Sequence, residues 1–209
     1  MERITYTPQD ENALVASASR GDLDAFNSLV LLHQDFLFNL AARTLGDDDR
    51  AEDAVQEALI SAFRSLHSFH GGSFRAWLAR TVINKCYDEY RRTSRHPSLP
   101  LTPILDGEEV EDWDWLSDPA PSLQSRLEED ELNDALQHCM LTLPFSHRTV
   151  LALVDVDGFS YDEAAVALKI PVGTVKSRLA RARAAMRETL REVADLLPST
   201  YQSFLSVPA

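Results

Sequence analysis

Basic side chains recur at close spacing over residues 172–191, where they could bind the phosphate backbone of a nucleic acid. This segment has one acid, Glu188, against six bases: Lys176, Arg178, Arg181, Arg183, Arg187 and Arg191. At about 100° per residue, the apolar positions from Val175 to Leu190 fall on one stripe of a helix, which must face a core. On the opposite side the bases flank a strip of small residues. A helix of this shape can enter a major groove and contact phosphates on both of its walls.

The residues before this basic helix complete a helix-turn-helix motif. Ser160 and Glu163 have the spacing of a capping box, in which each side chain bonds the other residue's backbone amide. The helix that they open is short and ends near Lys169, and Pro171 then suits the first position of the next helix. A solvated basic face alone would not require the box, the tight turn and the two-sided layout together. Residues 160–186 therefore predict a unit that reads duplex DNA.

A second basic helix is predicted from Phe74 to about Arg92, and it mixes bases with aromatic residues. Residues 75–95 contain six bases against two acids. Positive charge for the phosphate backbone and flat rings for unstacked bases are what single-stranded DNA binding needs. The preceding loop, HSFHGG, could form one wall of a pocket for a flipped base. Trp77 has apolar neighbours, so a core position and a DNA contact are equally compatible with it.

An acidic face is predicted on the helix that precedes this loop. Four residues on neighbouring turns form an acidic patch with an apolar centre: Asp53, Gln56, Glu57 and Ile60. Such a patch suits a basic helical partner. The run Asp47–Asp49 could serve only to cap the helix and to complement its dipole.

Start and stop signals divide the chain into two small helical domains. Gly21 and Gly46 end helices, and Asp22 can cap the helix that follows the first of them. Five of the ten prolines lie between His96 and Ser122, which excludes one regular element there. We therefore predict an all-α fold in which a flexible acidic linker joins the two domains and the second is a helix-turn-helix domain. The predicted bounds are 10–95 for the first domain, 96–124 for the Pro-rich acidic linker, 125–192 for the second domain and 193–209 for a C-terminal tail.

The net charge of −13 argues against a nucleic-acid partner only as an average. Eleven acids against one base lie between Asp106 and Glu131, so the charge is segregated into blocks. Cys86 and Cys139 flank no metal-ligand pattern, and we expect buried thiols, no metal and no cofactor. The N-terminus lacks the pattern of a signal peptide, and the most apolar stretch is too short and too polar to span a bilayer. We expect a cytoplasmic protein without direct membrane insertion.

The segment SYDEAAVALKIPVGTVKSRLARARAAM resembles the promoter-reading element in the second domain of extracytoplasmic-function sigma factors. The preceding LPFSHRTVLALVDVDGFS resembles the first half of that domain. Two positions depart from the family pattern: Lys169 stands where glycine is common in the turn, and Ala180 stands where a larger residue often helps base contact. The resemblance implies that the second domain reads the upstream (−35) promoter element. The expected contact residues are Thr174, Lys176, Ser177, Arg178, Arg181 and Arg183.

The first half of the chain resembles the other domain of the same family. GDDDRAEDAVQEALISAFRSLHSF resembles the segment that docks on the polymerase clamp, which implies contact through Asp53, Gln56, Glu57 and Ile60. GGSFRAWLARTVINKCYDEYRR resembles the segment that opens and reads the downstream (−10) element. The residues expected to contact DNA there are Arg75, Trp77, Arg80, Asn84 and Lys85. The acidic linker, with Trp113 and Trp115, is compatible both with a solubilising spacer and with a segment that threads the polymerase's positively charged channel.

The resemblance implies a sigma factor of the small two-domain group, one that binds core RNA polymerase and directs promoter-specific initiation, as in stress or envelope responses. Its partners would be core RNA polymerase, promoter DNA and an anti-sigma factor, which in this group is commonly membrane-linked. A stand-alone helix-turn-helix regulator is the alternative, but it leaves the acidic face and the basic-aromatic helix without a purpose. A carboxylate-rich helical enzyme is disfavoured because no Glu-x-x-His spacing occurs. We therefore expect a protein that is not itself an enzyme.

Overall fold

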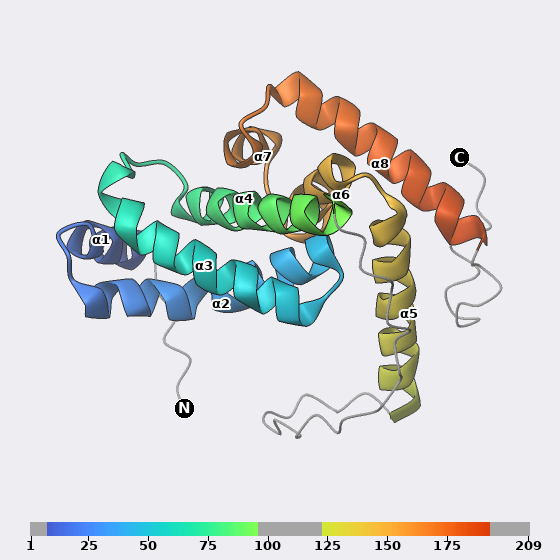
Figure 1. Ribbon diagram of the computed structural model, residues 1–209, viewed down its shortest axis with the longest axis horizontal. Helices are drawn as coiled ribbons and strands as arrows, with labels where there is room; N and C mark the ends of the chain where they lie inside the picture. Colours follow the sequence, from blue (N-terminus) through green and yellow to red (C-terminus); the bar gives the residue numbers. More distant parts are fainter. Residues whose placement is uncertain (1–7, 96–122, 193–209) are drawn as a thin grey trace.

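The computed structural model describes residues 8–95 and 123–192, and every regular element in these two ranges is helical (Figure 1). The predicted all-α fold is confirmed. The elements are α1 (Pro8–Ala18), α2 (Leu23–Leu45), α3 (Asp48–Ser65), η1 (Leu66–Ser68), α4 (Phe74–Arg95), α5 (Leu123–Thr142), α6 (Phe145–Leu151), η2 (Ala152–Val156), α7 (Tyr161–Leu168) and α8 (Val172–Glu192). We call α1–α4 the N-terminal lobe and α5–α8 the C-terminal lobe. Most of the predicted linker, residues 96–122, and the predicted tail lie outside the described residues.

Local signals set the helix ends of the N-terminal lobe. The Asp22 carboxylate accepts hydrogen bonds from the amides of Asp24 and Ala25, and Asp47 caps α3 in the same way through the amide of Arg50. Gly46 ends α2 in the left-handed conformation, with φ of 72°. The predicted caps and stops are therefore confirmed. The apolar stripes of α2, α3 and α4 meet in one core, which includes Leu29, Leu37 and Leu40 among its fully buried members.

The C-terminal lobe contains the predicted helix-turn-helix. Both hydrogen bonds of the capping box between Ser160 and Glu163 are present at the start of α7. Lys169 ends α7 in the left-handed conformation, with φ of 53°, and α8 begins one residue after Pro171. Val175, Leu179 and Ala182 of α8 are buried, as the apolar stripe predicted. The helix before the motif is regular only to Leu151 and continues as the π-helical turn η2, in which the amide of Asp157 bonds the carbonyl of Ala152.

The two lobes pack directly against each other, with α7 beside α4 and α5 and η2 beside α2. In Figure 1, α4 lies between the hairpin of α2 and α3 and the helices of the C-terminal lobe. Tyr87 and Tyr90 of α4 contact the ring of Phe145, with centroids 5.4 and 5.0 Å apart. The sequence predicted two domains and a linker, and it did not predict this interface.

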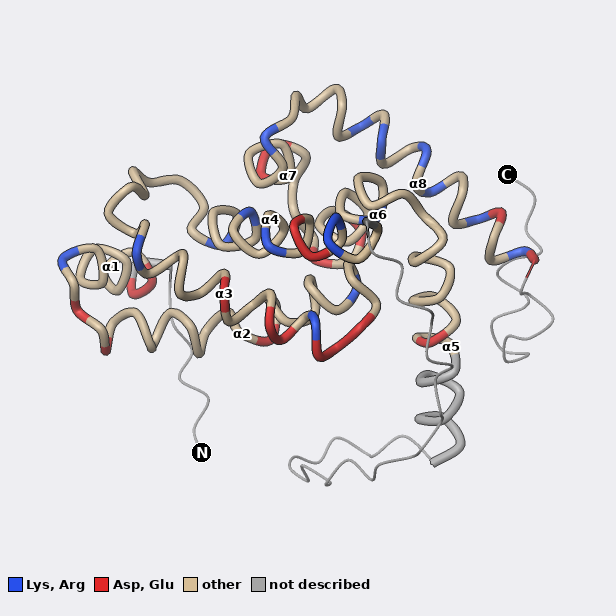
Figure 2. The backbone as a smooth tube through the Cα atoms, viewed as in Figure 1, with Lys and Arg blue, Asp and Glu red and all other residues tan. Residues whose placement is uncertain are grey.

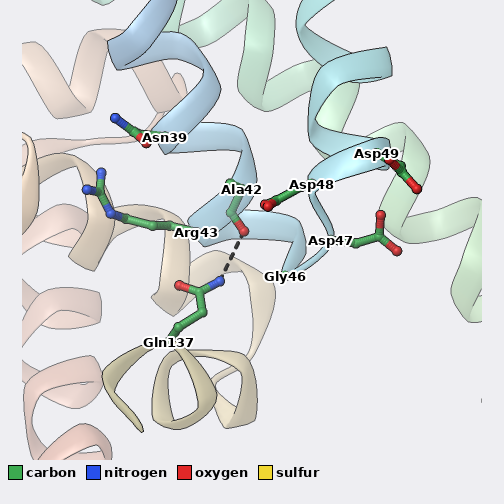
Figure 3. A pocket seen from close by; sticks show the side chains of 8 residues that line it. All are labelled: Asn39, Ala42, Arg43, Gly46, Asp47, Asp48, Asp49 and Gln137. Carbon is green, nitrogen blue, oxygen red and sulfur yellow. Dashed lines mark hydrogen bonds between the residues drawn. The ribbon is translucent and has the colours of Figure 1, made fainter. Parts of the chain in front are cut away.

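The junction of α2 and α3 forms part of the interface with α5. A cavity of about 490 Å³ opens there, and the Gln137 amide donates a hydrogen bond of 3.0 Å to the Ala42 carbonyl across it (Figure 3). Gly46 lies so close to Leu141 that an added Cβ would meet that side chain. The end of α2 therefore needs glycine both for its left-handed backbone and for the approach of α5.

Candidate nucleic-acid and protein interfaces

The basic residues of α8 lie along the outer side of the C-terminal lobe, where Figure 2 shows them spaced over the length of the helix. Lys176, Ser177 and Arg181 are exposed, and Thr174 and Arg178 are half-buried. The described contacts leave the guanidinium groups of Arg178 and Arg181 without an ion pair among residues 10–94 and 132–192. The stripe that faces the core is apolar and the outer side is cationic, which is the arrangement needed for insertion into a major groove.

Arg183 differs from the other predicted contacts of α8 because it has a partner in its own lobe. Its Nε and Nη2 donate hydrogen bonds of 2.8 and 2.6 Å to the two carboxylate oxygens of Asp155. This bidentate contact raises the pKa of the Arg183 guanidinium above its ordinary value. Arg183 could reach DNA only by exchanging this carboxylate for a phosphate.

Trp77 and Arg80 of α4 line a cavity of about 460 Å³ together with the loop that precedes the helix. The Trp77 ring is half-buried and packs against Phe69 and Phe74, with centroids 5.7 and 5.6 Å away. Trp77 thus belongs to the edge of the core and also to the cavity wall, and its contact with DNA stays a prediction. The opposite wall of the cavity comes from α7, through Asp162, Glu163 and Val166.

Arg75 lies on another side of α4, at the interface of the lobes. Its guanidinium stacks on the rings of Phe36 and Phe159, 4.3 and 4.5 Å from their centroids. Its Nη2 donates a hydrogen bond of 2.9 Å to the backbone carbonyl of Asp157. The five residues predicted to contact DNA in the N-terminal lobe therefore do not form one patch in this arrangement.

The remaining two residues of this set are not among the residues that line the cavity. Asn84 is exposed, and the ammonium of Lys85 forms an ion pair of 3.1 Å with Glu57. Because Glu57 is 69% exposed and Lys85 30%, this pair is solvated and weak. It joins one residue predicted to contact DNA and one predicted to contact polymerase.

The predicted acidic face of α3 is free of the C-terminal lobe. Asp53, Gln56 and Glu57 are exposed, and Ile60 is 54% exposed. The helical repeat puts Phe63 on the apolar side of α3, but its side chain is only partly buried. One face of its ring meets Phe26 at 5.0 Å, but the side chain is 38% exposed and extends the apolar centre formed by Ile60.

Sequence reasoning missed the residues that join the lobes. Arg148 is buried, and its guanidinium donates to the carbonyls of Thr44, Leu141 and Leu143 at 2.6, 2.6 and 3.0 Å. Arg43 forms an ion pair of 3.3 Å with Asp157, whose side chain is 8% exposed. Burial outweighs the attraction of the nearby arginines and raises the pKa of Asp157 to about 6. A single base in the apolar stretch 143–154 was the one available signal for Arg148.

Two family models match the chain, one in each lobe. Residues 29–96 match Sigma-70 region 2, and residues 133–186 match Sigma-70, region 4. Together with the helix-turn-helix and the all-helical fold, these matches define the class as a two-region sigma-70 protein. None of the helices in the described part of the chain is long and apolar enough to cross a membrane.

The relatives narrow the class further. The chain is 35% identical to the RNA polymerase sigma-H factor of Pseudomonas aeruginosa over 186 residues, which cover 88% of this chain and 96% of that protein. It is 35% identical to the extracytoplasmic-function (ECF) sigma factor SigW of Bacillus subtilis over 188 residues, 86% of this chain and 96% of the relative. It is 34% identical to the ECF sigma-E factor of Escherichia coli over 177 residues, 84% and 92% of the two chains. The chain belongs to the family of extracytoplasmic-function RNA polymerase sigma factors.

Two solved structures have similar folds at 28% sequence identity. One is CnrH in complex with the cytosolic domain of CnrY, with a TM-score of 0.60 over 87% of this chain and 97% of the other. The second is the sigma factor RpoE in complex with the anti-sigma factor NepR from Bartonella quintana, with a TM-score of 0.58 over 79% and 96% of the two chains. Sigma factors direct transcription initiation. Membership of this family therefore disfavours the alternative of a stand-alone helix-turn-helix regulator.

Proposed function

We propose that this sigma factor binds core RNA polymerase through the exposed face of α3, reads the −35 element with α8 and opens the −10 element with α4. The proposal rests mainly on the combination of three features in one chain. These are the exposed cationic helix α8 of the helix-turn-helix, the basic-aromatic helix α4, and the exposed acidic face of α3 with its apolar centre. Catalysis of RNA synthesis belongs to the polymerase, so the chain itself is not an enzyme. It would work in the cytoplasm, where the nucleoid and the polymerase are.

The proposed contacts follow from exposure and chemistry. For the −35 element they are Thr174, Lys176, Ser177, Arg178, Arg181 and Arg183; for the −10 element they are Arg75, Trp77, Arg80, Asn84 and Lys85. For polymerase they are Asp53, Gln56, Glu57 and Ile60, a carboxylate and amide ring around an apolar centre that complements a basic, partly apolar helix. Arg178 and Arg181 are the strongest candidates for base reading, because arginine bonds guanine edges in the major groove with two hydrogen bonds.

A regulatory partner is also proposed. Of the two structurally similar proteins, the sigma factor RpoE was solved with the anti-sigma factor NepR, and CnrH was solved with the cytosolic domain of CnrY. We propose that an anti-sigma factor, held at the membrane or free, binds this chain and withholds it from polymerase. Co-purification of the tagged full chain from its own host, with identification of the bound proteins, tests this partner separately from polymerase binding.

Polymerase binding is tested with Ile60→Asp, which places a charge at the apolar centre of the α3 face. Leu31→Asp is the matched control, because Leu31 is 69% exposed on α2, outside the proposed interfaces. We expect Ile60→Asp to abolish co-purification of core polymerase and Leu31→Asp to retain it. Equal retention by both variants would remove the α3 face from the proposal.

Promoter reading is tested once transcript start sites, mapped after overexpression, have supplied both promoter elements. Arg178→Ala and Arg181→Ala should each cost about 1–3 kcal/mol of binding to duplex −35 DNA if the side chain reads a base edge. Arg191→Ala, near the end of α8, is the control and should weaken cognate and random DNA equally. An equal loss on cognate and random DNA for Arg178→Ala and Arg181→Ala would leave these residues only phosphate contacts.

A further inference from the structure

A short acidic segment, residues 155–157, holds one arginine from each of the two proposed DNA-reading helices. The Asp155 carboxylate binds Arg183 of α8 in the bidentate contact described above. The Asp157 backbone carbonyl accepts a hydrogen bond of 2.9 Å from Arg75 of α4. One segment of the C-terminal lobe thus binds Arg75 of the N-terminal lobe and Arg183 of its own lobe, both of which are proposed DNA contacts.

Asp155 and Asp157 face opposite ways because residues two apart on a helix are separated by about 200° around its axis. Asp155 faces α8 of its own lobe. Asp157, two residues later, faces the other lobe, where its carboxylate contacts Arg43 of α2 at 3.3 Å.

The contact of Arg75 is built from both lobes. Phe36 comes from α2 and Phe159 from the turn before α7, and the two rings lie 5.7 Å apart with the guanidinium over both. Phe159 is 4% exposed, so this cation–π contact is shielded from water, where such contacts are strongest. Arg75 can contact DNA only if it leaves these rings and the Asp157 carbonyl.

The same packing places α7 over the cavity that contains Trp77 and Arg80. The wall that α7 contributes bears two carboxylates, Asp162 and Glu163. A nucleic-acid backbone that approached Trp77 would meet these negative charges, which repel phosphate. The cavity would therefore accept a base only after α7 has moved away from α4.

The geometry points to an autoinhibitory latch: the 155–157 segment, with Arg43, Arg75 and the Phe36–Phe159 ring pair, holds the lobes closed and keeps α4 from single-stranded DNA until the lobes separate. The inference rests on the proposed function, because it takes α4 as the helix that reads melted DNA. In the closed form Lys176, Ser177 and Arg181 of α8 remain exposed and the α3 face remains free, whereas Arg183 is paired with Asp155 within its own lobe. Duplex reading and polymerase docking are therefore open to the closed chain, and melting is withheld.

The main test is Arg43→Glu, which brings a second carboxylate to Asp157 and leaves every proposed DNA contact in place. Its control is Arg20→Glu, the same charge change at an exposed position after α1. The measurements on the full chain are the radius of gyration from small-angle X-ray scattering and the affinity for a fluorescent oligothymidylate of about 12 nucleotides. We expect Arg43→Glu to raise the radius of gyration and to bind the oligonucleotide several-fold more tightly than the wild-type chain. Arg20→Glu should keep the wild-type radius and bind no more tightly. A gain in DNA affinity from an added negative charge has no direct electrostatic explanation, so opening would account for it.

A second pair of variants is used if Arg43→Glu fails to fold, as judged by the loss of its helical circular dichroism signal. Asp157→Lys places a cation beside Arg43 and Arg75 and should open the chain, whereas Asp134→Lys makes the same charge change at an exposed position of α5. A wild-type chain whose scattering already corresponds to separated lobes would overturn the latch whatever the variants do. Variants that fold and keep the wild-type radius would also overturn it, and opening without a gain in oligonucleotide binding would overturn the occlusion of α4. Promoter-directed transcription with core polymerase tests the proposed function separately, and its failure would leave the scattering result intact.

Discussion

Arg148 is the buried base on which the junction of the two lobes depends, and Arg148→Met is the perturbation that tests this role. The side chain is 6% exposed, and two of its nitrogens donate to three backbone carbonyls. The Leu141 and Leu143 carbonyls belong to the end of α5 and the residue after it, and the Thr44 carbonyl belongs to the end of α2. One guanidinium therefore binds backbone carbonyls at the ends of two helices in different lobes. These carbonyls have no hydrogen-bond partner within their own helices.

The magnitude follows from opposing contributions. Hydrogen bonds from a charged donor stabilise by about 1.5–3 kcal/mol each. Burial of the charge opposes them: it lowers the pKa of Arg148, and the Nε of Arg148 has no partner among the described residues. Methionine fills similar space but leaves three carbonyls without donors, so we expect a loss of about 3–5 kcal/mol in the free energy of unfolding. Such a loss is a large share of the roughly 5–15 kcal/mol that stabilises a typical domain.

The assay is urea unfolding of the full chain followed by far-ultraviolet circular dichroism. Arg148→Lys is the intermediate variant, because an ammonium can replace some of the bonds but lacks the planar geometry that serves three carbonyls. Arg20→Met, at an exposed position, is the control and should change the stability by less than about 0.5 kcal/mol. A loss below about 1 kcal/mol for Arg148→Met would refute the reasoning, because it would mean that water or a shifted helix end satisfies the three carbonyls.

Two backbone predictions concern residues in the left-handed conformation. Lys169→Gly should raise the stability by roughly 0.5–1 kcal/mol, because Lys169 has φ of 53° at the end of α7 and glycine adopts this conformation without strain. Thermal unfolding would show the gain as a higher midpoint, and a lower midpoint would contradict the prediction. Gly46→Ala should cost more than Gly21→Ala, both in urea unfolding, because both glycines have positive φ but only at Gly46 would the added Cβ meet Leu141. Equal losses would show that α5 does not press on the end of α2.

The elements that sequence reasoning predicted well are those that depend on neighbours within a few residues. Asp22, Asp47 and the Ser160–Glu163 box all cap the helices predicted for them, because a cap joins a side chain to an amide two or three residues away. The apolar stripe of α8 is also local, since it follows from the helical repeat. Fold class and helix-turn-helix were therefore predictable without any tertiary information.

The interface between the lobes could not be predicted in the same way. Arg148 and Thr44 are 104 residues apart in the chain, and Arg43 and Asp157 are 114 apart. No periodicity or cap links residues at such separations, and both arginines could equally have been solvated bases. The same limit explains Phe63, which the helical repeat assigns to the buried stripe although no neighbour covers its outer face. Local rules decide which side of a helix is apolar, and the packing of other elements decides how much of that side is covered.

The closed form should also depend on pH through Asp157. Its pKa is raised from an ordinary 3.8 to about 6, because burial outweighs the attraction of Arg43 from α2 and of Arg75 from α4. Asp155 lies on the same segment but faces Arg183, and Glu163 of α7 is near Arg75. If the carboxyl returns to its ordinary pKa when the lobes separate, the closed form binds the proton more tightly than the open form does.

The sign of the pH effect then follows from linkage. The cost of burying the charged carboxylate is fully present above about pH 6, falls as the pH is lowered from there, and is absent below about pH 4. Since each pKa unit corresponds to about 1.4 kcal/mol, the cost at neutral pH is at most about 3 kcal/mol. Acidification from about pH 7.5 to about pH 5.5 should therefore stabilise the closed form of the wild-type chain further, and oligothymidylate binding should become weaker.

Asp157→Asn separates this effect from other titrations. Asparagine keeps the shape of the side chain and can still accept a hydrogen bond from Arg43, but it has no charge to bury, so oligothymidylate binding by the variant should be equally weak at both pH values. His33 is another titratable group, and burial lowers its pKa, but it contacts Glu11 within the N-terminal lobe and is unchanged in the variant. A pH response that is the same in the variant and in the wild-type chain would assign the effect to His33 or to another group, and would mean that Asp157 is equally buried in the open and closed forms.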